Sequence, residues 1–354
     1  MMPTAGERGA WLIAGTGMVG SVIGWMIAPA QFPHAWLAAV TCFLGWPLGS
    51  IALVLIHALT GGRWGYAIRP QLAAGIATLP VLLPALVPLV LAAHALYPWT
   101  RAGAAWVPAN HFYLNAPFFC ARAALYLTVW LGLALRVQGA LRQDDSQARL
   151  YRLAPPALML LALTVTFAAI DSTLSLEPQF KSSIYGMLEC TESILLALSI
   201  ALAGMARAGR SEDIPAIRDL SRLLLALLVL WAYLDFMQIL IIWNSDLPDE
   251  AGWYLQRLAG TWAPLAIAIA ALHFLLPFFA LLWPAVQRSR KAIASIAALL
   301  ALIEIPRAWW NVIPASGRGP DWVDAAAMMA VLGLAAGIAL RFFRSRAPTA
   351  YSND

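Results

Sequence analysis

The chain has 354 residues, of which 61% are hydrophobic and only 12% are charged. Soluble domains average about 25% charged residues, so this composition excludes an ordinary soluble protein. The formal net charge of +5 gives no nucleic-acid signal, because the basic residues are divided among short segments between apolar runs. The three cysteines, Cys42, Cys120 and Cys190, share no short spacing, so the sequence favours neither disulfides nor a metal, iron–sulfur or haem site.

Apolar runs of about 20 residues recur along the chain, and each is long enough to cross a bilayer as a helix. We therefore predict an all-α polytopic membrane protein, with residues 1–354 forming a single integral membrane domain. The ten predicted spans are about 10–31, 35–58, 72–96, 113–136, 154–172, 182–206, 221–243, 256–284, 291–311 and 322–343.

The placement of Lys and Arg predicts the orientation of these spans. Most of the 23 basic residues fall on the side that also contains both termini, and only Arg122 and Arg307 fall inside spans. Under the positive-inside rule that side is cytoplasmic, which places the protein in a bacterial inner membrane with both termini in the cytoplasm. The opposite side is then the periplasm.

Two acidic, proline-containing segments are predicted to face the periplasm. One runs from Asp171 to Gly186, and the other joins the seventh and eighth spans. We interpret both as loops that dock partner proteins, although ordinary polar turns would show the same composition. The candidate docking residues are Glu177, Pro178, Lys181, Asp246, Asp249 and Glu250.

Several ionisable residues lie inside the predicted spans, where each costs several kcal/mol unless it is paired or hydrated. Most fall at a similar depth below the periplasmic surface, whereas His57 and His273 are placed in the cytoplasmic half. Glu189 and Glu192 are spaced i, i+3 and share a helix face, so we expect at least one of them to hold a proton. Arg122 is the predicted counter-charge. The candidates for a proton path are Asp171, Glu189, Glu192, Asp235, Glu304, His57 and His273.

An alternative reading of the same residues is an Arg–carboxylate pin that only holds helices together. A lone histidine in a helix is likewise more often hydrogen-bonded to a backbone carbonyl than active in proton transfer. Both alternatives are compatible with a proton path elsewhere in the cluster.

Five motifs, taken together and in order, resemble a known family. Asp171-x-x-x-Ser-Leu-Glu-Pro178 followed by Ser182-Ser-Ile-Tyr-Gly186 resembles the signature of ActF, the second NrfD/PsrC-like membrane subunit of alternative complex III, a quinol:cytochrome c or HiPIP oxidoreductase. The segments 57–65, 113–122, 240–250 and 277–291 agree with further motifs of that family. The sequence departs from the signature at Ser172, Gln179-Phe180 and Lys181.

The resemblance implies two four-helix bundles, about 35–172 and 182–311, flanked by outer helices at 10–31 and 322–343. It implies a non-redox subunit of a respiratory electron-transport complex that provides a scaffold and a proton conduit. Its partners would be an ActC-like NrfD paralogue, an iron–sulfur subunit and a multihaem cytochrome c. No covalently bound cofactor is expected, and quinol or menaquinol and lipids would lie near the chain.

Two other functions stay open at this point. The chain could be a quinol-binding catalytic subunit, in which the carboxylates or a histidine accept the quinol protons. It could also be a secondary transporter, although the sequence contains neither an inverted repeat nor the paired broken helices that are typical of that class.

Overall fold

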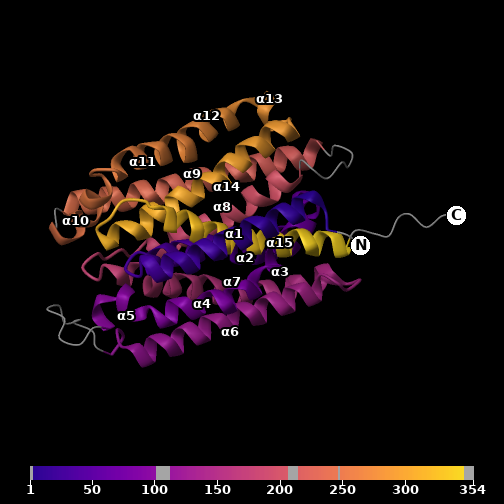
Figure 1. Cartoon of the computed structure of the whole chain (residues 1–354). Coiled ribbons are helices and arrows are strands. Elements are labelled where there is room, and N and C mark those ends of the chain that lie inside the picture. The colour runs from indigo at the N-terminus through magenta and orange to yellow at the C-terminus, as the bar shows by residue number, and fades with distance from the viewer. Residues whose placement is uncertain (1–2, 101–111, 206–213, 246–247, 347–354) are drawn as a thin grey trace.

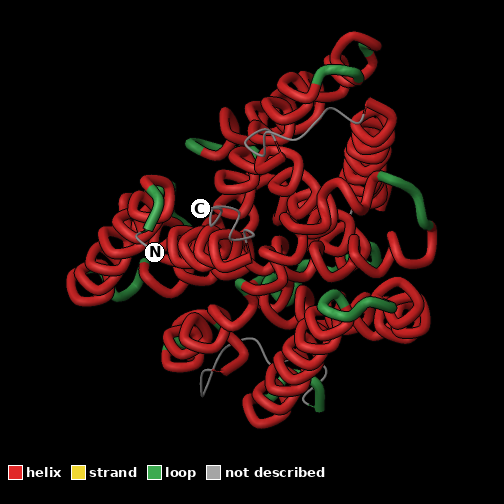
Figure 2. The backbone as a smooth tube through the Cα atoms, turned by 90° about the vertical axis from the view of Figure 1, so that its right-hand side faces the viewer, coloured by secondary structure: helices red, strands yellow, loops and turns green. Residues whose placement is uncertain are grey.

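The computed structural model describes residues 3–100, 112–205, 214–245 and 248–346. Within these ranges there is no strand, and ten helices are long and apolar enough to cross a membrane. The prediction of an all-α polytopic membrane protein is therefore confirmed. Figure 1 shows the long helices lying roughly side by side along one direction, and Figure 2 views them from a direction at 90° to the first.

The spans consist of single helices or of short series of helical segments. They are α1 (Ala5–Ile27), α2 (Phe32–Thr60), α3–η1–α4 (Trp64–Ala77, Leu79–Val81, Leu82–Leu91), α6 (Ala116–Ala140), α7 with η3 (Ser146–Ser172, Leu174–Leu176), α8 (Tyr185–Met205), α9 (Ile214–Ser245), α11–η4–α12 (Trp262–Ile269, Ala270–Leu275, Leu276–Leu282), α14 with η5 (Arg290–Val312, Ile313–Ser316) and α15 (Trp322–Arg346). The remaining short elements are α5 (Ala93–Leu96), η2 (Pro98–Thr100), α10 (Pro248–Arg257) and α13 (Pro284–Gln287).

Helix α2 occupies the centre of the protein and packs against α3, α7, α8, α14 and α15. Small residues permit the closest of these contacts. A Cβ atom added at Gly49 of α2 would lie 1.9 Å from the carbonyl oxygen of Ser193 in α8. Without a hydrophobic force between helices in lipid, such close backbone approach is a main source of helix association. The second close pair, α1 and α15, likewise meets at Gly17 and Gly333.

The third span is broken where prolines interrupt its hydrogen bonds. Pro80 lies in the 3₁₀ segment η1, and Pro88 lies inside α4. Proline has no backbone N–H to donate to the preceding turn, so the α-helix gives way to a 3₁₀ segment at Pro80, whereas α4 continues through Pro88 with one hydrogen bond fewer. The chain changes from α3 through η1 to α4 without leaving the apolar layer.

The predicted beginning of the eighth span is wrong. Residues 248–257 form the separate helix α10, and the chain then turns at Gly260, whose φ of 54° lies in the left-handed region. The span itself begins at Trp262 and contains the π-helical segment η4. Pro277 follows this segment and cannot donate to the carbonyl of His273, which accounts for a local widening of the helix.

The short helices α5 and α10 lie at one end of the protein, and the N-terminal end and α13 lie at the other (Figure 1). The connecting loops thus lie alternately at the two ends of the protein, as successive membrane spans require. The assignment of either end to the cytoplasm, and the division into two four-helix bundles, stay predictions.

Candidate functional site

A cluster of buried ionisable side chains joins three helical elements. Glu192 projects from α8, His273 from η4, and Glu304 and Arg307 from α14, and each is at most 8% exposed. Arg307 forms an ion pair with Glu192, and its Nε lies 3.9 Å from Oε1 of Glu304. His273 Nε2 lies 3.3 Å from Oε2 of the same glutamate. The π-helical segment thus carries a histidine that completes the cluster.

Helix α9 places the aromatic ring of Trp231 and the carboxyl group of Asp235 beside the cluster. The guanidinium of Arg307 lies 5.1 Å from the centre of the Trp231 ring, a cation–π distance. The same ring meets the ring of His273 edge-on, with centroids 4.3 Å apart. Asp235, one turn further along α9, lines a cavity together with Arg307. Trp231 therefore contacts both Arg307 and His273.

Two cavities adjoin the cluster and differ in character. A small cavity of about 30 Å³ is lined by Glu189, Glu192 and Glu304, and this volume is enough for a water molecule. Its other polar lining residues are Thr41, Thr173, Ser193 and Asn311. A second cavity of about 640 Å³ is mostly apolar and is lined by Asp235 and Arg307. Arg307 thus contacts the carboxylates of the small cavity and also lines the large one.

The charge balance of the cluster determines its chemistry. Glu189, Glu192, Asp235 and Glu304 supply four carboxyl groups in or beside the cluster, whereas Arg307 is the one permanent cation that forms ion pairs with any of them among the described residues. If all four were ionised, they would leave unpaired negative charge in a low-dielectric region, at a cost of several kcal/mol per group.

No protein-family model matches this chain, and no curated protein matches it either.

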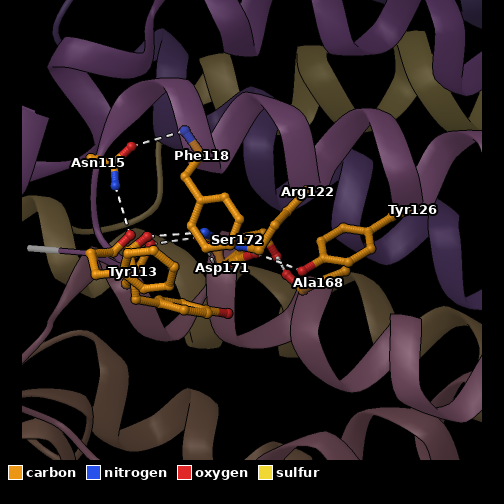
Figure 3. A network of polar contacts seen from close by, with 10 residues as sticks. Tyr113, Asn115, Phe118, Arg122, Tyr126, Ala168, Asp171 and Ser172 are labelled. Atoms are coloured by element: carbon orange, nitrogen blue, oxygen red, sulfur yellow. Dashed lines mark hydrogen bonds and ion pairs between the residues drawn. The ribbon is translucent and has the colours of Figure 1, made fainter. Parts of the chain in front are cut away.

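Arg122 is not the counter-charge of Glu189 and Glu192, and this prediction is corrected. Its Nε and Nη2 donate to the two carboxylate oxygens of Asp171, each over 2.8 Å (Figure 3). The Tyr126 hydroxyl donates to the same carboxylate over 2.8 Å, and Nη1 of Arg122 donates to the carbonyl of Tyr113. The Tyr113 ring lies 3.9 Å below the guanidinium. This network links α6 to α7 and occupies both carboxylate oxygens of Asp171. It has the geometry of an ion pair that holds two helices together.

His57 lies apart from the cluster, in the last turn of α2, next to the residues that join α2 to α3. Its Nε2 is 2.9 Å from the carbonyl oxygen of Gly62, and its ring meets Trp64 and Tyr66 edge-on. A Cβ atom added at Gly65 would lie 2.1 Å from the imidazole. These contacts hold the turn together, which agrees with the alternative reading of a histidine bonded to the backbone.

His273 was placed in the cytoplasmic half by sequence, and its position is corrected. The span begins at Trp262 rather than near residue 256, so His273 lies closer to the middle of the helix and reaches Glu304. The proton-path candidates that the structure brings together are Glu189, Glu192, Asp235, Glu304 and His273.

Part of the predicted docking surface contacts other segments of the same chain. Glu177 accepts a hydrogen bond of 2.6 Å from Nη2 of Arg257, whose side chain is buried. Arg257 also donates to the carbonyls of Trp310 and Asn311 in α14. Burial lowers the pKa of the Arg257 guanidinium, and Glu177 opposes that shift. Glu177 therefore fastens the 171–186 segment to α10 and α14.

The other docking candidates differ in exposure. Lys181 is exposed, and Pro178 and Glu250 are half-buried. Asp246 and the side chain of Asp249 lie outside the described residues. Docking at these loops stays a prediction.

Sequence reasoning missed the two arginines that organise the site. Arg307 was noted only as a basic residue inside a span, although it follows Glu304 by three residues and so lies on the same helix face. Arg257 lies in α10, which buries it against Trp253, with the guanidinium 3.6 Å from the ring centre. The i, i+3 spacing was an available signal for Arg307. No pattern in the sequence indicated the burial of Arg257.

Within the described ranges, no group of three or more His, Cys, Asp or Glu side chains is placed to hold a metal ion.

Proposed function

We propose that this chain is a non-redox membrane subunit of a quinol-oxidising respiratory complex of the alternative complex III type, and that it conducts protons through its buried cluster. The observation that carries the proton-conducting part is that Glu192 and Glu304 pair with one arginine, Arg307, while Glu189 and Asp235 line the two adjoining cavities. The five ordered motifs that resemble ActF support membership of such a complex.

The outer half of the proposed path leads from the cluster toward the end of the protein that contains α10. The small cavity is lined by Thr173, which caps α7, and by Asn311 in the last turn of α14. Hydroxyl and amide groups at these positions support hydrogen-bonded water between the bulk solvent and Glu189. A proton entering here meets Glu189 before it reaches the Glu192–Arg307 pair.

The inner half of the proposed path passes three uncharged polar side chains. Ser199 Oγ, Ser221 Oγ and Gln71 Oε1 are buried and have no hydrogen-bond partner among the described residues. They belong to α8, α9 and α3, three helices that pack against one another. Buried polar atoms without a protein partner are typical positions for internal water, which carries protons along hydrogen bonds.

Membership of the complex is tested by purifying an affinity-tagged chain from its native membranes. The proposal expects an iron–sulfur protein, a multihaem cytochrome c and a second NrfD-like protein to co-purify, together with quinol oxidation activity. Haem staining and mass spectrometry identify these partners. Recovery of the chain alone, with solute uptake when it is reconstituted in liposomes, would instead support a transporter.

A further inference from the structure

Three arginines line a cavity at the turn that joins α6 to α7, away from the buried cluster. The cavity has a volume of about 590 Å³, and its lining includes Arg136, Arg149 and Arg152 but no acidic residue among those that the structure describes. Successive spans alternate in direction, so this turn lies at the same end of the protein as the N-terminus (Figure 1). A cavity of this size with one sign of charge is suited to an anionic ligand.

The chain itself neutralises these arginines only weakly. Arg136 and Arg152 are exposed and form no ion pair within the described part of the chain. Arg149 pairs with Asp145 over 2.6 Å, but both side chains are about half exposed, and exposed pairs of this kind are weak. The segment 136–152 contains four arginines against two aspartates. Positive charge therefore remains available to a ligand at this turn.

The cavity lies at the depth of the lipid headgroups. Helix α6 has 25 residues and is about 37 Å long, which exceeds the hydrocarbon layer of about 30 Å, so its last turns extend among the headgroups. Arg136 lies in those turns, and Arg152 lies in the second turn of α7. Met159 follows Arg152 by two helical turns on the same face and is 69% exposed. A charged region and an apolar surface thus succeed each other along α7.

The side chains of the cavity match a phosphate group. The planar guanidinium of arginine donates two parallel hydrogen bonds to phosphate oxygens, and Gln143, another lining residue, adds amide donors. Basic cavities between membrane helices are typical sites for anionic headgroups. A zwitterionic headgroup would bring a quaternary ammonium beside three arginines, so the charge of the site favours a lipid with net negative charge.

We infer that this cavity binds an anionic phospholipid, with its phosphate between Arg136, Arg149 and Arg152 and its acyl chains along α6 and α7. The apolar surface at Met159 favours a lipid over a soluble phosphate compound or an acidic protein segment, neither of which would cover it. The inference uses only the membrane-spanning architecture and the charges of this turn. It does not rest on the proposed function, and either can fail without the other.

The test is native mass spectrometry of the purified full chain in mild detergent, titrated with phosphatidylglycerol or with phosphatidylcholine of the same acyl chains. The wild-type chain is expected to bind phosphatidylglycerol about tenfold more tightly or better. Arg136→Gln combined with Arg152→Gln is expected to weaken that binding by about tenfold or more. Arg142→Gln combined with Arg341→Gln is the matched control, because it removes two exposed arginines that do not line the cavity. It is expected to keep the wild-type affinity.

A photoreactive amino acid placed at Gln143 identifies the occupant in native membranes. Crosslinks to phospholipid are expected, and crosslinks to a protein would assign the cavity to an acidic segment of a partner and overturn the inference. Equal affinity for the two lipids, or equal affinity of the two double variants for phosphatidylglycerol, would also overturn it. Glycerol 1-phosphate that binds as tightly as the lipid would assign the cavity to a free phosphate compound instead.

Discussion

At the scale of single residues, Arg307 determines the state of the buried cluster. It pairs with Glu192, lies 3.9 Å from Glu304 and stacks near Trp231. Its removal leaves several carboxyl groups without a cation in a low-dielectric region, where an unpaired charge is costly. The carboxyl groups would then be forced to take up protons or to admit water.

We predict that Arg307→Gln lowers the free energy of unfolding of the purified chain by about 3–5 kcal/mol, because it leaves Glu192 as an uncompensated buried group. The double variant Arg307→Gln with Glu192→Gln is expected to lose less than the sum of the two single losses. Denaturant unfolding in detergent measures all four proteins of this cycle. Additive losses would show that the pair does not interact.

The residue scale also shows which parts of the site could be predicted from sequence. The buried positions of Glu189, Glu192, Asp235 and Glu304 follow from charged residues within apolar runs. Their partners do not follow, because pairing depends on how each helix is rotated about its axis. Arg122 and Arg307 both fall inside predicted spans, yet α6 turns Arg122 toward Asp171 and α14 turns Arg307 toward Glu192.

At the scale of helical elements, small residues determine how closely the helices approach. Gly49 of α2 lies directly against the backbone of α8 at Ser193. Because α8 carries Glu189 and Glu192, this contact also fixes the position of the cluster relative to α2.

We predict that Gly49→Ala destabilises the protein by about 1–3 kcal/mol or more, because its Cβ atom would lie 1.9 Å from the Ser193 carbonyl oxygen and force the helices apart. Gly132→Ala in α6 is the matched control, since a Cβ atom there would meet nothing within 4 Å. Thermal unfolding of the two variants measures the difference. Equal melting temperatures would contradict the close contact between α2 and α8.

The number and order of the spans could be predicted from hydropathy, because each helix must be apolar along its length to cross lipid. The true beginning of the eighth span, which was expected near residue 256, could not be predicted in this way. The helix α10 is short and amphipathic in sequence, and its buried face depends on Arg257 meeting Glu177, a residue 80 positions earlier. Contacts between segments so distant in sequence leave no local pattern.

At the scale of the whole molecule, the described ends of α1 and α15 and the two sets of loops define two faces. Glu7 near the start of α1 forms an ion pair of 2.8 Å with Arg344 near the end of α15, so these ends lie on one face. The opposite face carries α5 and α10 (Figure 1). The distribution of Lys and Arg predicts that the first face is cytoplasmic.

We predict that Lys181→Cys reacts with a membrane-impermeant maleimide in cells whose inner membrane is intact, and that Asp144→Cys reacts only after that membrane is opened. Both native residues are exposed, and they lie in loops on opposite faces. The exposed native Cys120 is replaced by serine in both variants to remove background labelling. The reverse pattern of labelling would contradict the orientation.

The central claim for the whole molecule is that protons pass through the buried cluster. Its most direct test is the ratio of protons translocated to electrons transferred by the purified complex in proteoliposomes. The variant is Glu189→Gln, which removes an exchangeable proton from the small cavity with little change in size. The control is Asp144→Asn, an exposed loop residue outside the cluster.

The proposed path predicts a lower ratio for Glu189→Gln while quinol oxidation by the partner subunit continues, and a wild-type ratio for the control. A wild-type ratio for Glu189→Gln, measured at an unchanged rate of quinol oxidation, would contradict a proton path through the cluster and leave the ion pairs as fastenings between helices.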